Sequence, residues 1–171
     1  DGSDKLDLSR EELTYLPPAI GDLADLVELD LTGNQLTELP AEIGNLRSLT
    51  RLNARNNQLA YLPPELGNLS NLKGLFLQEN ELTQLPSEIG CLANLGRLNS
   101  SNNRLTDLPS EIGKLTNLTW LYMADNAIAA LPKEFGLLSA LTNCYLQGNK
   151  LSFLPAEIGD LAYLTELQLD R

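Results

Sequence analysis

The residues of this chain that could do chemistry are carboxylates, arginines and aromatic side chains, because the sequence contains no histidine. Without histidine there is no Ser-His-Asp or Cys-His arrangement and no histidine-based metal site. Asp7 and Asp30 could stand close together, but carboxylates on an open surface stay hydrated and lack the pKa tuning that acid–base catalysis needs. The glycines recur with a turn and form no phosphate-binding loop. We therefore predict that the chain is not an enzyme.

A regular series of glutamates, spaced by 23 residues, suggests a metal site at first sight. Its members are Glu42, Glu65, Glu88, Glu111, Glu134 and Glu157. Each follows a proline by two residues, where its charge favours the N-terminus of a helical turn. Calcium prefers a loop of mixed oxygen ligands, which this pattern lacks. We therefore expect no metal and no other cofactor.

The aromatic and basic side chains suit binding better than catalysis. Four of the nine aromatic residues fall on one expected face of the molecule, together with three arginines. Tryptophan, tyrosine and arginine dominate the energetics of protein interfaces. We predict a partner-binding site with these members: Trp120, Tyr122, Tyr145, Phe76, Arg97, Arg51, Arg55 and Asn99.

Two structural interpretations compete with this binding site. The aromatic side chains could instead cover one another and stiffen a sheet, as cross-strand pairs do for about 0.2–1 kcal/mol each. The arginines could belong to a solvated face whose charge is balanced by Glu79 and Glu81. Both alternatives stay open from the sequence alone.

A repeat of 23 residues positions these side chains, and it reads L-x-x-L-x-L-x-x-N-x-L-x-x-L-P-x-E-I-G-x-L. Its opening leucines, which we number position 1, are Leu26, Leu49, Leu72, Leu95, Leu118, Leu141 and Leu164. Residues 28–32 alternate polar with apolar, which indicates a strand with one buried face. Equivalent strands must stack in parallel, so we expect eight strands, with the side chains at positions 3 and 5 pointing away from the core.

The rest of the repeat is expected to connect the strands. The asparagine at position 9 is expected to form hydrogen bonds with the backbone of adjacent turns. The Leu-Pro-x-Glu-Ile-Gly segment predicts a short helical turn that begins at the proline.

The repeats divide the chain into segments of one domain, residues 1–171. Residues 1–25 form a divergent first repeat, and residues 164–171 form a truncated last repeat. The full repeats cover residues 26–48, 49–71, 72–94, 95–117, 118–140 and 141–163. Solenoids need polar caps at their ends. The uncapped C-terminal repeat therefore makes end-to-end self-association, or a longer parent chain, an alternative.

Charge and cysteine usage restrict the partners and the compartment. A formal net charge of −11 argues against binding to nucleic acid or to anionic membranes. No stretch approaches the roughly 20 apolar residues of a membrane helix, so no membrane insertion is expected. Cys91 is expected on the outer surface and Cys144 in the core, too far apart to form a disulfide. The lack of a terminal cysteine cluster favours a reducing, cytoplasmic location.

The repeat resembles leucine-rich repeats of the 23-residue type, and its L-P-x-E-I-G-x-L half is similar to intracellular Ras-group proteins and their bacterial relatives. The resemblance implies a right-handed horseshoe of the α/β class, with a parallel β-sheet on the concave face and short helical or 3-10 turns on the convex face. It also implies a non-catalytic module that binds a protein or peptide through the concave sheet. The alternatives are a targeting domain cut from a larger signalling protein or enzyme, and a structural self-associating array.

Overall fold

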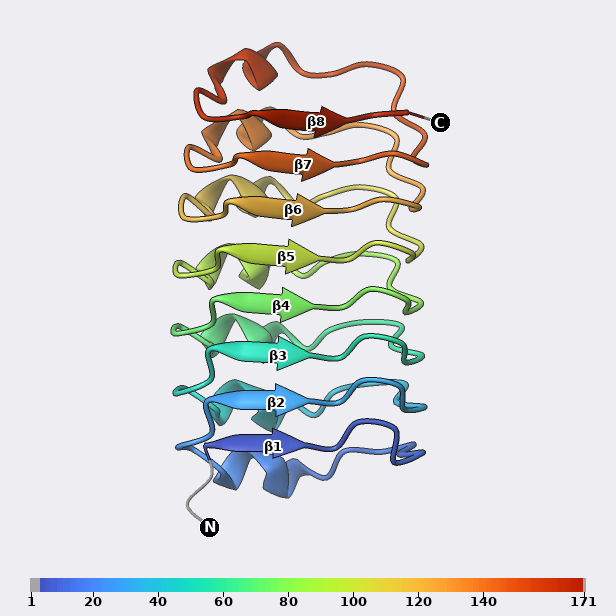
Figure 1. Ribbon diagram of the computed structural model, residues 1–171, viewed down its shortest axis with the longest axis vertical. Helices are drawn as coiled ribbons and strands as arrows, with labels where there is room; N and C mark the ends of the chain where they lie inside the picture. Colours follow the sequence, from blue (N-terminus) through green and yellow to red (C-terminus); the bar gives the residue numbers. More distant parts are fainter. Residues whose placement is uncertain (1–3, 171) are drawn as a thin grey trace.

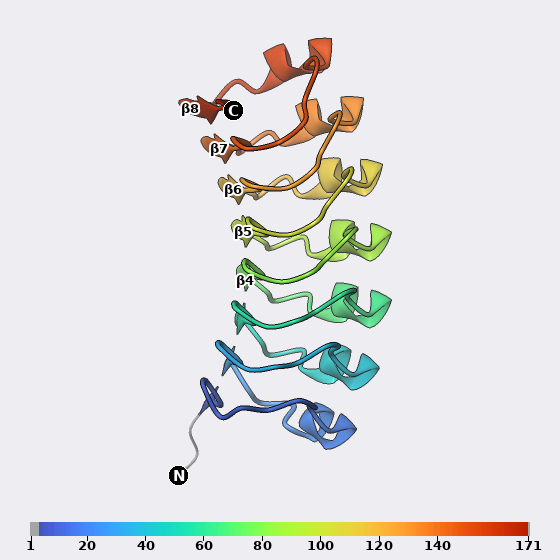
Figure 2. The same ribbon diagram turned by 90° about the vertical axis from the view of Figure 1, so that its right-hand side faces the viewer.

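The computed structural model describes residues 4–170 as a stack of similar turns in which strands alternate with short helices (Figure 1). The strands form one open parallel sheet whose order follows the chain from β1 to β8. Their bounds are β1 Lys5–Asp7, β2 Glu28–Asp30, β3 Arg51–Asn53, β4 Gly74–Phe76, β5 Arg97–Asn99, β6 Trp120–Tyr122, β7 Asn143–Tyr145 and β8 Glu166–Gln168. Figure 2 shows the strands along the concave side of the stack and the helices along its convex side. The predicted solenoid with a parallel sheet is confirmed.

Alternation along each strand sends its middle side chain into the core. The strand registers join equal positions of neighbouring repeats, so that Leu29 pairs with Leu52 and Leu98 with Leu121. All four leucines are buried. The residues on either side of them in the strand must therefore face the concave surface. The pattern of the sequence thus determines which side chains are available to a partner.

The asparagine at position 9 ties adjacent turns together. The side-chain Nδ2 of Asn80 donates to the carbonyl oxygens of Ala54 at 2.9 Å and Leu77 at 3.0 Å. Its Oδ1 accepts a hydrogen bond of 3.0 Å from the backbone N–H of Leu59. Equivalent bonds are made by Asn34, Asn57, Asn103, Asn126 and Asn149. The structural role predicted for this asparagine is confirmed.

Short 3-10 helices form the convex side. Within residues 4–170 they are η1 Pro18–Asp22, η2 Ala41–Asn45, η3 Pro64–Asn68, η4 Ser87–Cys91, η5 Ser110–Lys114, η6 Lys133–Leu137 and η7 Ala156–Asp160. The repeated proline was expected at the first helical position, but it lies one residue earlier, as Pro86 does before η4. Its backbone is extended there, with ψ 149°, so it leads the chain into the helix without belonging to it.

The glycine in each of the helices η1 to η6 allows adjacent turns to pack closely. A Cβ atom at Gly90 would lie 2.6 Å from the carbonyl oxygen of Glu111 in the next turn. That separation is too short for a real side chain, so the helices can stack at this distance only with glycine. The glutamate series therefore marks a packing contact between helices.

The two cysteines lie where the sequence predicted them. Cys144 takes the place of a core leucine in β7 and is completely buried, whereas Cys91 at the end of η4 is exposed. Burial raises the pKa of the Cys144 thiol to about 12. Cys144 therefore serves as a small apolar side chain in the core.

Candidate interaction surface

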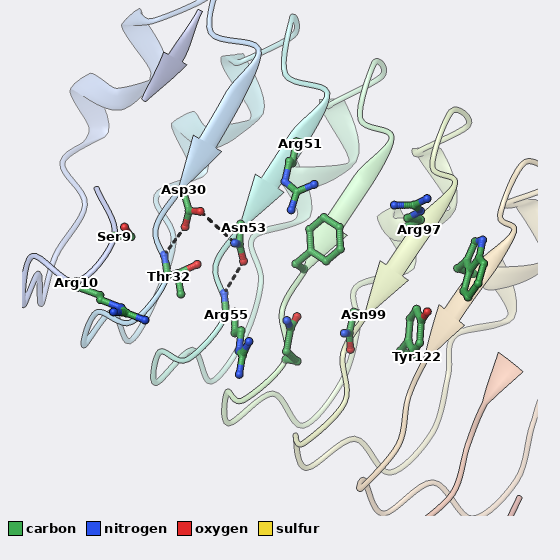
Figure 3. A pocket seen from close by; sticks show the side chains of 13 residues that line it. Ser9, Arg10, Asp30, Thr32, Arg51, Asn53, Arg55, Arg97, Asn99 and Tyr122 are labelled. Carbon is green, nitrogen blue, oxygen red and sulfur yellow. Dashed lines mark hydrogen bonds between the residues drawn. The ribbon is translucent and has the colours of Figure 1, made fainter. Parts of the chain in front are cut away.

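The concave face of the sheet is hollowed into a groove of about 770 Å³, which we call the concave groove. It is lined by side chains from β2 to β6 and from the turns that follow β1 to β4 (Figure 3). Seven of the eight predicted binding residues line it: Arg51, Arg55, Phe76, Arg97, Asn99, Trp120 and Tyr122. The eighth, Tyr145 on β7, lies beside this lining and contacts Tyr122. The structure therefore brings the predicted residues together, and their binding role stays a prediction.

Trp120, Tyr122 and Tyr145 form a continuous group that we call the aromatic stack. The ring centroids of Trp120 and Tyr122 are 6.0 Å apart with planes at 17°. Those of Tyr122 and Tyr145 are 4.7 Å apart with planes at 3°, because the strand register places these residues side by side. Burial raises the pKa of the Tyr122 hydroxyl above its usual value.

The stack corrects one sequence expectation. The three aromatic side chains were expected to be exposed, but all are half-buried. Stacked aromatic pairs contribute about 0.5–1.5 kcal/mol beyond the burial of their area. The rings therefore do cover one another, as the structural alternative proposed, while Trp120 and Tyr122 still line the concave groove.

The hydroxyl group of Tyr145 is bound to the neighbouring strand β8. It donates a hydrogen bond of 2.7 Å to Glu166 Oε2, which also accepts one of 2.9 Å from Asn143 Nδ2. The bond between Tyr145 and Glu166 raises the pKa of the tyrosine and lowers the pKa of the glutamate. Tyr145 therefore supports the outer end of the aromatic stack.

The arginines of the concave face are of two kinds. Arg55 forms an ion pair with Glu79, with 2.7 Å between Nη2 and Oε1, so the balanced-charge interpretation is correct for this residue. Arg51 instead places its guanidinium carbon 4.5 Å from the ring centroid of Phe76, in a cation–π contact. Within residues 4–170, neither Arg51 nor Arg97 forms an ion pair with a carboxylate. Two positive charges are therefore available to a partner.

Several residues of the concave groove were not among the predicted binding residues. They are Ser9, Arg10, Asp30, Thr32, Asn53 and Gln78. Four of these follow the strands at positions 7 and 8, whereas the prediction relied mainly on positions 3 and 5. Position 7 continues the period-two alternation of positions 3 and 5, so the sequence already indicated that residues at position 7 face the concave surface.

The additional residues give the groove polar character. Asp30 accepts hydrogen bonds of 2.9 Å from the backbone N–H of Thr32 and 3.2 Å from Asn53 Nδ2 (Figure 3). Thr32 Oγ1 and Gln78 Oε1 are buried and have no hydrogen-bond partner among the described residues. The groove thus combines cations, aromatic rings and unused polar atoms, which is a composition that can bind a peptide.

Among residues 4–170, no three cysteine, aspartate or glutamate side chains are grouped so that they could hold a metal ion. In the same residues, no helix has the length and apolar character required to cross a bilayer.

The fold and its lined concave sheet define a class of protein, the repeat solenoid, whose members commonly serve as protein-interaction modules and are generally not enzymes. The family model described as "Leucine rich repeat" matches residues 4–59 and 93–151. The chain therefore belongs to the leucine-rich-repeat family, as the sequence predicted. A comparison with curated proteins gives no match. The closer similarity to Ras-group proteins stays a prediction.

Solved structures with this fold include bacterial and plant proteins. A leucine-rich-repeat protein from Leptospira interrogans is 34% identical, with a TM-score of 0.69 over 95% of this chain and 53% of its own. An internalin from Listeria monocytogenes is 27% identical, with a TM-score of 0.81 over 98% of this chain and 47% of its own. The plant peptide hormone receptor RGFR1, solved in complex with RGF2, is 32% identical, with a TM-score of 0.73 over 91% of this chain and 30% of its own. This chain therefore spans about half or less of each neighbour's length.

Proposed function

We propose that this chain is a non-catalytic interaction module that binds a protein or peptide partner through its concave sheet. The observation that carries the proposal is the concave groove, in which Trp120 and Tyr122 lie beside Arg97, a residue that forms no ion pair within residues 4–170. The repeat needs no aromatic residue at these positions, since other repeats have polar residues there. Tryptophan, tyrosine and arginine at the centre of a surface are the residue types that most often dominate binding energy.

A second reading places the module within a larger protein. It is favoured by the comparison with solved structures, because the chain covers only 53%, 47% and 30% of the lengths of the three neighbours. In this reading the concave sheet would direct a signalling protein or enzyme to its partner. A scaffold role and a cytoplasmic location stay predictions, and so does end-to-end self-association.

The test compares capture of partner proteins by three forms of the chain. The first is the wild type, and the second carries Trp120→Ala, Tyr122→Ala and Tyr145→Ala. A matched control replaces three exposed aromatic residues away from the concave groove, Tyr15, Tyr61 and Tyr163, also by alanine. Captured proteins are identified by mass spectrometry, and binding is then measured with the purified partner.

We expect the wild type and the control to retain the same partner, while the concave variant loses it. Circular dichroism must show that the concave variant remains folded, because its aromatic side chains lie outside the leucine core. Retention of every partner by the folded concave variant would exclude this face as the binding surface.

A further inference from the structure

Three neighbouring strands carry an unusual combination of residues at position 3. The register places Arg51 of β3 beside Gly74 of β4, and Gly74 beside Arg97 of β5. The arginines are therefore two strand spacings apart, which is about 10 Å at the usual spacing. Gly74 contributes no side chain between them. Arg51 and Arg97 thus lie on either side of Gly74, where the position 3 column lacks a side chain (Figure 3).

The ring of Phe76 forms the floor of this gap. A Cβ atom at Gly74 would lie 2.9 Å from Cε2 of that ring, which shows that Phe76 folds back over the glycine. The guanidinium carbon of Arg51 is 4.5 Å from the ring centroid. A guanidinium stacked on an aromatic ring keeps its N–H donors free to bind a carboxylate with two hydrogen bonds.

A hollow of about 390 Å³ opens at this gap, and we call it the cationic hollow. Lys73 joins Arg51 and Arg97 in its lining, while Gly74 and Gly96 leave room between them. Lys73 and the two glycines were not singled out from the sequence. The hollow therefore combines three cations with the space left by Gly74 and Gly96, where other repeats have longer side chains.

Among the described residues, the cations that line the cationic hollow outnumber its carboxylates, since Arg51, Lys73 and Arg97 share it with Glu28. Within residues 4–170, none of Arg51, Lys73 and Arg97 forms an ion pair. Glu28 also lines the hollow, but its carboxylate is bound by Lys5 at 2.9 Å. Three unmatched cations stand out in a chain whose formal net charge is −11. Clustered like charges repel one another and attract an anionic group from a partner.

We propose that the cationic hollow binds a side-chain carboxylate in an extended acidic segment of a protein partner. The inference rests on the proposed function and names the chemistry of the partner. Strands β4 and β6 are about 10 Å apart, and an extended peptide rises about 3.3 Å per residue. A peptide that crosses the strands would therefore place an apolar or aromatic residue on Trp120 and Tyr122 about three positions from its acidic residue.

The charge distribution favours an acidic peptide over nucleic acid. The cations form one local cluster, whereas a nucleic acid presents a long row of phosphates that a chain of net charge −11 repels. An acidic peptide needs only one or two anionic groups at the cluster, and its other residues can occupy the aromatic part of the concave groove.

The test is a selection from a phage-displayed library of random dodecapeptides on four forms of the chain. They are the wild type, the double variant Arg51→Gln with Arg97→Gln, the double variant Trp120→Ala with Tyr122→Ala, and a charge-matched control. The control carries Arg47→Gln and Lys133→Gln, which remove the same charge from exposed positions outside the hollow. The best peptide from the wild type is then synthesised, and its affinity for each form is measured at low and high salt.

The wild type and the control should select peptides with Asp or Glu about three positions from an aromatic or aliphatic residue. The Arg51/Arg97 variant should bind the best peptide about tenfold more weakly, which corresponds to about 1.4 kcal/mol, and the remaining affinity should depend less on salt. The inference is overturned if the selected peptides are not acidic, or if the Arg51/Arg97 variant binds them as the wild type does.

The proposed function can survive that result. Peptides without acidic residues that bind the wild type and fail to bind the Trp120/Tyr122 variant would retain the concave surface and reject the cationic hollow. If the wild type selects no peptide above background, both the acidic peptide and peptide binding by this face are refuted.

Discussion

Replacement of Asn80 by alanine tests whether the asparagine series holds the turns of the solenoid together. Asn80 is 8% exposed and lies in the middle of the stack. The substitution leaves the backbone N–H of Leu59 without its 3.0 Å partner, and a buried unsatisfied donor costs about 1–3 kcal/mol. It also removes one bond each from the carbonyls of Ala54 and Leu77.

These two carbonyls do not become unsatisfied. Ala54 also accepts from Asn57 Nδ2 at 3.2 Å, and Leu77 accepts from Asn103 Nδ2 at 3.0 Å. Each lost bond therefore costs only the net value of one hydrogen bond, about 0.5–1 kcal/mol. Together, the three changes should lower the free energy of unfolding by roughly 2–5 kcal/mol.

The assay is urea unfolding followed by far-ultraviolet circular dichroism, with Asn68→Ala as the control. Asn68 is an exposed residue at the end of η3, so its replacement should change stability by less than about 0.5 kcal/mol. Asn80→Asp should be at least as destabilising as Asn80→Ala, because a carboxylate would face two carbonyl oxygens. If Asn80→Ala and Asn68→Ala unfold at the same urea concentration, the asparagine bonds do not stabilise the stack.

Three further outcomes can be checked on the same material. Leu121→Ala empties a fully buried position and should lower the free energy of unfolding by about 2–5 kcal/mol, measured with urea. A smaller loss than that of the Trp120/Tyr122/Tyr145 triple variant would contradict the assignment of the two sheet faces. Ser100→Ala should stabilise the chain by about 1 kcal/mol, because Ser100 Oγ is buried without a partner in the described residues, and a loss of stability would show that the hydroxyl is satisfied. Ellman's reagent at mildly alkaline pH should modify the exposed Cys91 but not Cys144, whose pKa is about 12, and should reach both thiols only after unfolding.

The sequence predicts the fold of this chain well because one repeat determines almost all of it. Period-two alternation places Leu29 and its equivalents in the core. The constant 23-residue spacing predicts that neighbouring strands pair in parallel, with equal repeat positions side by side. The helix start was wrong by one residue because proline is compatible both with the first helical position and with the residue before it. The close approach of Gly90 to Glu111 was not visible, since it depends on the distance between turns.

The location of the candidate site was also predictable, but its internal contacts were not. The repeat positions of Arg51, Arg55 and Arg97 show that these arginines lie on the same face of the sheet. The sequence does not show which of them forms an ion pair with a carboxylate. Arg55 forms an ion pair with Glu79, whereas Arg51 and Arg97 form none within residues 4–170. Such contacts depend on rotamers and local backbone geometry, which a repeat pattern does not encode.

The aromatic stack supports both the structural and the binding interpretation, and the two reinforce each other. A half-buried ring that packs against its neighbour at 4.7 Å has already lost much of its rotamer freedom in the free protein. A partner that docks on Trp120 and Tyr122 therefore has less side-chain entropy to remove, which favours affinity. The same contacts leave the outer ring surfaces accessible to the concave groove. Self-coverage of the rings is thus the arrangement expected of a preorganised binding surface.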